Sequence, residues 1–195
     1  MKILVACEFS GIVRDSFTAA GHDALSCDLS PTERPGKHYQ GDVLDIIGDG
    51  WDMMIAHPPC TYLSRVATRH LYGGGYLHED RYAMGVEAAE FFMKLYNAPI
   101  PRIAIENPVP FLIFDLPKVS QIINPSHFGH SVSKKTCLWL KNLPPLMSTY
   151  ICANPETTKK RGGWFNILTG SVRAAARSRT FQGIADAMAE QWGKL

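Results

Sequence analysis

One cysteine of this chain directly follows two prolines, in the segment His57-Pro58-Pro59-Cys60. Two consecutive prolines restrict the backbone where a predicted buried strand ends, so the next side chain is aimed rather than free to move. A thiol held in a cleft at a strand end can act as a nucleophile when its thiolate is accessible. The alternative is a buried structural cysteine, but the Pro-Pro context favours a nucleophile.

A carboxyl group ends another predicted strand, in the segment Glu106-Asn107-Pro108. Burial there would raise the pKa of Glu106 and let it donate or accept a proton on a bound ring. The alternative is a strand-end acid paired with Arg102 or Lys135. Because ligands of parallel sheets bind beyond the carboxyl ends of the strands, Cys60 and Glu106 are expected to meet in one cleft.

Three further positions could hold a cofactor. The segment Glu8-Phe9-Ser10-Gly11 forms a tight turn from a strand into a helix, whose first N–H groups are available to a ligand. Asp28 follows about twenty residues later, where an acid can hold ribose hydroxyls, and Asp42 could accept a hydrogen bond from an adenine amino group. The alternatives are a simple turn, a helix cap or loop acid, and a turn aspartate. The glycine-rich dinucleotide fingerprint is absent, since Gly11 is the turn's one glycine.

These residues depend on elements that the hydrophobic pattern predicts. Continuous apolar runs predict buried strands over residues 3–7, 24–27, 52–56, 102–106 and 136–140, and helical spacing predicts helices over 12–20, 79–96 and 183–192. Ser10 is the expected N-cap of the first helix and Gly21 its stop, and one face of the second helix is expected to share Ala83, Val86, Ala89, Glu90 and Met93. Strands alternating with helices indicate an α/β fold, a mostly parallel sheet with helices on both faces.

Length and composition fit one globular domain over residues 1–195, with 46% hydrophobic and 19% charged residues. Residues 149–176 are expected to form a small excursion or mobile loop, and the glycine-rich stretch 61–76 another loop, which could close over the site. The net charge of +2 neither demands nor excludes nucleic acid. One segment is strongly basic and could face either phosphates or solvent: Lys159, Lys160, Arg161, Arg173, Arg177 and Arg179.

The cysteines and histidines predict no metal site. The five cysteines form no Cys-x-x-Cys pair, and the histidines have no consistent ligand spacing, with His127-Phe128-Gly129-His130 the nearest approach. No signal peptide and no membrane-length apolar run are evident. A cytoplasmic protein with free thiols and no membrane partner is therefore expected.

The order of these motifs resembles the C5-cytosine DNA methyltransferases. That family carries a Phe-x-Gly turn, an acid after the second strand, an aspartate after the third, a Pro-Cys nucleophile and a Glu-Asn motif, in the order found here from Phe9 to Asn107. The chain is also similar to short phage and prophage proteins of that kind, whose Arg-Ser-Arg-Thr-Phe and Gly-Ile-Ala stretches correspond to residues 177–181 and 183–185. The resemblance implies a Rossmann-like methyltransferase fold with S-adenosyl-L-methionine as cofactor.

The resemblance also assigns roles to residues. It implies that Cys60 and Glu106 are catalytic. The residues implied to bind the cofactor are Phe9, Ser10, Gly11, Asp28, Asp42 and Pro58. Those implied to bind the substrate are His57, Pro59, Asn107, Lys135, Arg177 and Arg179. The family's Arg-x-Arg element is not found at its usual place, and Lys134 with Lys135, or Arg177 with Arg179, are the candidates to replace it.

The implied reaction is methylation of C5 of cytosine in DNA through a covalent Cys60 adduct. Two alternatives stay open. Residues 107–182 leave little room for a target-recognition domain, which favours a pyrimidine nucleotide or single-stranded nucleic acid as substrate. Ile12-Val13-Arg14 stand where the family has further glycines, which favours a catalytically degenerate module that binds nucleic acid or protein.

Overall fold

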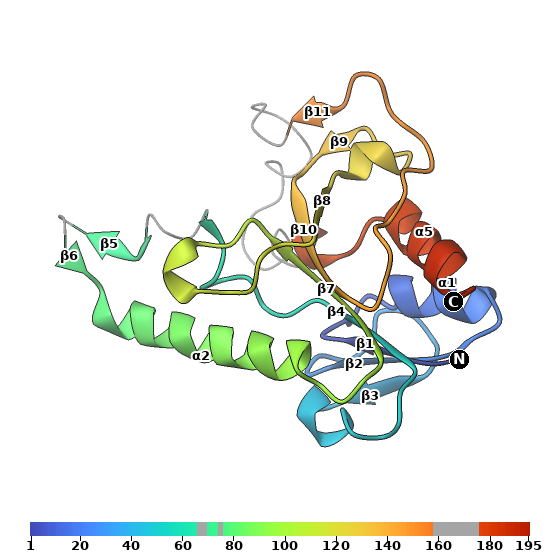
Figure 1. The fold of residues 1–195 in the computed structure, drawn as a ribbon, viewed down its shortest axis with the longest axis horizontal. Helices are drawn as coiled ribbons and strands as arrows, with labels where there is room; N and C mark the ends of the chain where they lie inside the picture. Colours follow the sequence, from blue (N-terminus) through green and yellow to red (C-terminus); the bar gives the residue numbers. More distant parts are fainter. Residues whose placement is uncertain (66–69, 74–75, 158–175) are drawn as a thin grey trace.

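The computed structural model describes residues 1–65, 70–73, 76–157 and 176–195. Its centre is a seven-stranded sheet in the order β3-β2-β1-β4-β7-β10-β8 (Figure 1). The strands are β1 (Lys2–Ala6), β2 (Asp23–Asp28), β3 (His38–Gln40), β4 (Met53–Ala56), β7 (Arg102–Pro108), β8 (Gln121–Ile123) and β10 (Thr136–Lys141). The protein is therefore of the α/β class, as the alternating pattern predicts.

Helices cover both faces of this sheet. Helices α1 (Ile12–Ala19) and α5 (Gln182–Trp192) lie side by side on one face, and α2 (Glu79–Tyr96) covers the other (Figure 1). Within β1, Ile3 and Val5 pack on the α1 and α5 side, whereas Leu4 and Ala6 pack on the α2 side. A strand buried on both faces needs apolar residues at every position, which explains the continuous run.

The strand order places a ligand-binding position at the centre of the sheet. Strands β3, β2, β1, β4 and β7 are parallel neighbours, as in doubly wound nucleotide-binding folds. The winding direction reverses between β1 and β4, and such folds bind ligands beyond the strand ends at that point. The expected mostly parallel sheet needs a correction, because β10 is antiparallel to both β7 and β8 and the sheet is only partly parallel.

The hydrophobic pattern does not predict several shorter elements. They are β3, β8, the 3-10 helices Val43–Asp45, Leu112–Phe114 and Pro125–His127, and two small sheets. One small sheet pairs β9 (Val132–Ser133) with β11 (Glu156–Thr157), and the other pairs β5 (Tyr72–Gly73) with β6 (Tyr76–Leu77). Part of the loop expected over 61–76 is thus a hairpin, and most of the excursion expected over 149–176 lies outside the described residues. In the described ranges, no helix is long and apolar enough to cross a membrane.

One local prediction about a helix is wrong. The N-cap of α1 is Gly11, at φ 72°, and not Ser10, and the buried Glu8 carboxylate accepts the N–H groups of Val13 and Arg14. The buried residues of α2 are Gly85, Phe92 and Leu95, and Ala89 and Met93 of the expected face pack against the same core. The stop of α1 is correct, since the helix ends just before Gly21, which has φ 86°.

Arg14 fastens the loop between β2 and β3 to α1. Its side chain is 1% exposed, and its guanidinium contacts the Asp15 carboxylate at 2.8 Å. The same group donates hydrogen bonds to two hydroxyls and two carbonyls, those of Ser26, Thr32, Arg34 and Pro35. A Cβ atom at Gly11 or Gly36 would collide with this guanidinium, so both glycines make room for it.

Replacing Arg14 by Ala should lower the free energy of unfolding by about 3–5 kcal/mol, because it leaves buried acceptors unpaired. Lys should not restore the loss, since one ammonium cannot reproduce the planar fork of donors. Urea unfolding measures the effect. Arg34→Ala is the matched control, because Arg34 also pairs with Asp15 but is 46% exposed, so about 1 kcal/mol or less is expected. Equal losses in Arg14→Ala and Arg34→Ala would contradict this account.

Candidate active site

The pairing of β4 with β7 brings the two predicted motifs together. Ala56, the last residue of β4, lies opposite Ile105, so the next positions in register are His57 opposite Glu106 and Pro58 opposite Asn107. The contacts follow this register: His57 Nδ1 lies 3.3 Å from Glu106 Oε2, and Asn107 Nδ2 donates to the Pro58 carbonyl at 2.9 Å. Asn107 is 2% exposed, and its amide holds the diproline turn against β7.

The chain segments that leave these two strands are also joined. The backbone N–H of Arg65 donates to the Val109 carbonyl at 2.9 Å, and that of Phe111 donates to the Leu63 carbonyl at 2.7 Å. An antiparallel bridge between Ser64 and Pro110 lies between these bonds. The segment that follows Cys60 is therefore fixed against the segment that follows Glu106.

The Cys60 thiol lies within the electrostatic reach of Glu106. Burial raises the pKa of Cys60, the Glu106 carboxylate raises it further, and the positive charges of Lys134 and Arg177 oppose both. Cys60 is half-buried, between the exposed Pro59 and the exposed Thr61, and belongs to neither hydrophobic cluster. Its sulfur is therefore not sealed in the core, as a nucleophile requires.

The pKa of Glu106 moves in the direction opposite to the prediction. Burial raises this pKa, but the hydrogen bond with His57 and the positive charges of Lys134 and His57 outweigh burial and hold it below its ordinary value. The side chain is 18% exposed. Glu106 is therefore a carboxylate at neutral pH rather than a proton donor.

Of the basic residues named above, Lys134 and Arg177 have positive charges that lower the pKa of Cys60. Lys134 Nζ donates to the Arg177 carbonyl at 3.1 Å, and both side chains act on the Cys60 thiol. Lys135 instead acts on the buried Cys137. The Arg179 guanidinium makes two hydrogen bonds to the Glu33 carboxylate and lies 6.0 Å from the centre of the Phe9 ring. Lys159, Lys160, Arg161 and Arg173 lie outside the described residues.

The turn before α1 differs from the expected free helix terminus. Glu8 is 4% exposed, and its carboxylate accepts hydrogen bonds from the backbone N–H groups of Val13 at 2.7 Å and Arg14 at 3.2 Å. The Ser10 hydroxyl donates to the same carboxylate at 3.2 Å and accepts from the Ile12 N–H at 3.3 Å. Because these groups are already paired, the start of α1 is not an anion site.

Asp28 and Asp42 lie near the end of β1. Each carboxylate accepts one local hydrogen bond, from the backbone N–H of Ser30 at 2.8 Å and of Leu44 at 2.9 Å respectively. Burial raises the pKa of the Cys7 thiol to about 12, and the charge of Asp28 and then those of Cys27 and Asp42 contribute. Cys7, at φ 57°, sits directly after β1. The carboxyl ends of β1, β2 and β3 therefore form a negatively charged region, in which Cys7 stays protonated.

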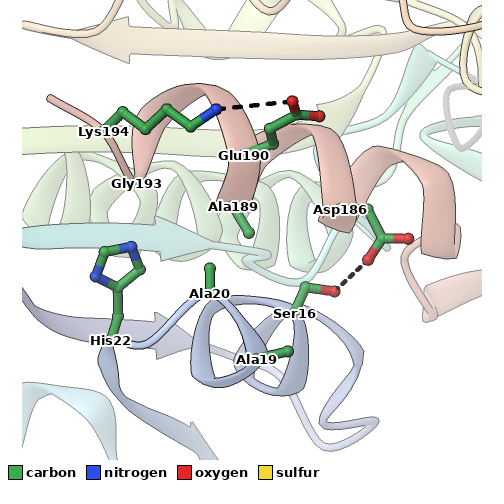
Figure 2. A pocket seen from close by; sticks show the side chains of 9 residues that line it. All are labelled: Ser16, Ala19, Ala20, His22, Asp186, Ala189, Glu190, Gly193 and Lys194. Carbon is green, nitrogen blue, oxygen red and sulfur yellow. Dashed lines mark hydrogen bonds and ion pairs between the residues drawn. The ribbon is translucent and has the colours of Figure 1, made fainter.

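Two hollows in the described part of the molecule lie away from Cys60. One, of about 480 Å³, is a groove between α1 and α5, where Ser16 contacts Asp186 and Lys194 contacts Glu190 (Figure 2). It lies near His22, at the amino-terminal end of β2, which is the edge opposite to the motifs. The other, of about 410 Å³, is lined by Ile12, His130, Ser131, Val132, Ala176, Arg179, Thr180, Phe181 and Gln182. It lies on the motif side, where α1 begins.

The histidines form no metal centre in the part of the chain that the structure describes, where no cluster of three His, Cys, Asp or Glu side chains could hold an ion. His130 Nε2 instead accepts a hydrogen bond at 3.0 Å from the backbone N–H of Gly183 at the start of α5.

Comparisons with known proteins find a structural match but no match of sequence. No protein-family model and no curated protein matches the sequence. Among solved structures, the chain is similar to a protein described as a candidate DNA modification methyltransferase encoded within a prophage of E. coli, at 13% sequence identity and a TM-score of 0.46. The match covers 80% of this chain and 52% of that protein, so this chain spans about half of its length. At this identity the chemistry has to be argued from the site.

Replacing Glu106 by Gln should make Cys60 react severalfold faster with iodoacetamide at neutral pH. The substitution removes a negative charge that raises the pKa of the thiol, so the thiolate fraction grows. Mass spectrometry of the Cys60 peptide measures the rate. Cys27 and Cys137, whose pKa values burial raises to about 12 and about 11, serve as unreactive internal references. Glu87→Gln on the exposed side of α2 is the control, and an unchanged Cys60 rate in Glu106→Gln would refute the coupling.

Proposed function

We propose that this protein is an S-adenosyl-L-methionine-dependent methyltransferase that methylates C5 of cytosine in DNA through a covalent adduct with Cys60. The observation that carries the proposal is the pair of joined strand ends. A half-buried cysteine and an ionised carboxylate within its electrostatic reach follow these two strands, at the edge of the sheet where doubly wound folds bind ligands.

The chemistry of the ring explains why a thiol is needed. C5 of cytosine is too weak a nucleophile to take a methyl group directly. Addition of the Cys60 thiolate to C6 moves electron density onto C5, whose electron pair would then form the bond to the methyl group. Loss of the C5 proton to solvent water and expulsion of the sulfur as thiolate restore the aromatic ring. Glu106 accepts a hydrogen bond from the exocyclic amino group as charge develops on the ring. Lys134 and Arg177 stabilise the thiolate against the effects of burial and Glu106.

The residues near the end of β1 fit the proposed cofactor. S-adenosyl-L-methionine, when bound, supplies an electrophilic methyl group on a cationic sulfur. The negative charge of Asp28 and Asp42 suits a cation and ribose hydroxyls, and the Phe9 ring offers an apolar surface.

One observation favours a smaller substrate as the second candidate. The described residues after Glu106 build β8, β10 and the short β9–β11 pair, which belong to the core or lie against it. A single-stranded end or a pyrimidine nucleotide needs no base flipping, and Lys134 and Arg177 could meet its phosphate. Arg14 favours the alternative of a catalytically degenerate module, because its side chain stands where the family has a glycine.

Cys60→Ser should abolish transfer of labelled methyl groups to cytosine, because a hydroxyl is a far weaker nucleophile at C6. Scintillation counting with duplex DNA, single-stranded DNA and dCMP as substrates measures transfer and separates the two enzymatic candidates. Cys152→Ser is the matched control. The one described contact of Cys152 is a hydrogen bond from its backbone N–H to the Ser126 carbonyl. Failure of the wild-type protein to label any of the three substrates would sink the proposal.

Asp28→Asn should weaken binding of S-adenosyl-L-methionine about tenfold, since it removes a charge but keeps the oxygen that accepts from Ser30. Calorimetry measures the dissociation constant. Asp80→Asn, at the exposed start of α2, is the control and should bind as the wild type does. Equal affinities in all three proteins would remove Asp28 from the cofactor site.

A further inference from the structure

His57 presents an unused nitrogen at the centre of the site. Its side chain is 7% exposed, and Nε2 is buried without a hydrogen-bond partner in the structure. A buried polar atom that stays unpaired is destabilising. Among the buried side-chain nitrogen and oxygen atoms of the described residues, this is the one that lacks a partner. Such an atom is expected where a ligand completes the pairing.

The other side of the ring is held in place. Nδ1 lies 3.3 Å from Glu106 Oε2, and the backbone N–H of His57 donates to the Ala6 carbonyl at 2.9 Å. The following turn is fixed by Asn107 through the Pro58 carbonyl. With Nδ1 held by the Glu106 carboxylate, Nε2 is the ring nitrogen left to pair with a bound ligand.

We propose that His57 is the general acid of the methyl-transfer reaction, and that Nε2 donates its proton to N3 of the cytosine ring as Cys60 adds to C6. This inference rests on the function proposed above. The thiolate electron pair forms the S–C6 bond, and the C5–C6 π pair moves through the ring to N3, which takes the proton from Nε2. The imidazolium becomes neutral, and the proton returns to it when the sulfur leaves. Glu106, already ionised, acts as an acceptor.

The pair of side chains also matches the edge of one base. A protonated Nε2 is a donor and the Glu106 carboxylate is an acceptor. Cytosine presents an acceptor at N3 next to a donor at its amino group, so both hydrogen bonds form at once. The pair would therefore orient the base as well as activate it.

The charges around His57 come from several elements. Glu106 follows in register on β7, Lys134 acts on Glu106 and on Cys60 from the segment before β10, and Arg177 acts on Cys60 from the segment before α5. On β1, Cys7 is next in register and stays protonated, with its pKa raised to about 12. In the wild type, the rate should thus rise with pH as Cys60 ionises.

The test uses His57→Gln, in which a neutral amide keeps a hydrogen-bonding group but cannot transfer a proton. Three quantities are measured from pH 5.5 to 9: the rate of adduct formation with DNA that contains 5-fluorocytosine, the rate of methyl transfer, and the dissociation constant of S-adenosyl-L-methionine. We expect adduct formation and methyl transfer to slow by about 100-fold or more, and cofactor affinity to stay within about twofold. His78→Gln, at the exposed start of α2, is the control and should behave as the wild type.

Failure of the His57 proposal and failure of the proposed function give different results in this test. If His57→Gln forms the adduct within about threefold of the wild-type rate, the role of His57 is disproved while the proposed function stands. If the wild-type protein forms no adduct and methylates no cytosine substrate, the proposed function fails and the role of His57 fails with it. Urea unfolding and unchanged cofactor affinity separate a lost proton donor from a misfolded variant.

Discussion

The candidate site depends on how β4 and β7 are paired. With Ala56 opposite Ile105, each motif finds its partner one and two residues later, His57 at Glu106 and Pro58 at Asn107. A slip of one residue would turn Glu106 to the α2 face of the sheet and separate it from His57, because side chains alternate between faces. The alternate packing of Ile103, Ala104 and Ile105 against the two cores opposes such a slip. The buried apolar residues thus set the geometry of the polar ones beyond them.

Charge balance at the strand ends follows from that geometry. Glu106 can stay ionised while largely buried because His57 and Lys134 offset its desolvation. Its negative charge, together with burial, disfavours the Cys60 thiolate. The Cys60 thiol is therefore mostly protonated and unreactive in the free protein. A bound ring that forms hydrogen bonds with His57 and Glu106 would shift the balance between thiol and thiolate. A nucleophile that ionises in the presence of substrate is protected from oxidation and alkylation in its absence.

The sequence predicts those features that depend on nearby residues. The apolar run from Ile3 predicts β1, and the two motifs could be placed at strand ends from their neighbours alone. The reversed β10 and the short β8 could not, because their places depend on pairing with distant strands. The same holds for Arg14, whose partners lie in a loop up to twenty-one residues away, and for the lowered pKa of Glu106, which needs His57 and Lys134.

The capped start of α1 bears on which cofactor can bind. In dinucleotide-binding folds, the free N–H groups of this helix hold a pyrophosphate, and glycines let it approach. Here Glu8 occupies those N–H groups and adds its own buried negative charge, and Asp28 and Asp42 add theirs nearby. A pyrophosphate would be repelled. S-adenosyl-L-methionine has no phosphate and carries positive charge on its sulfur and its amino group, so the features that exclude a dinucleotide favour this cation.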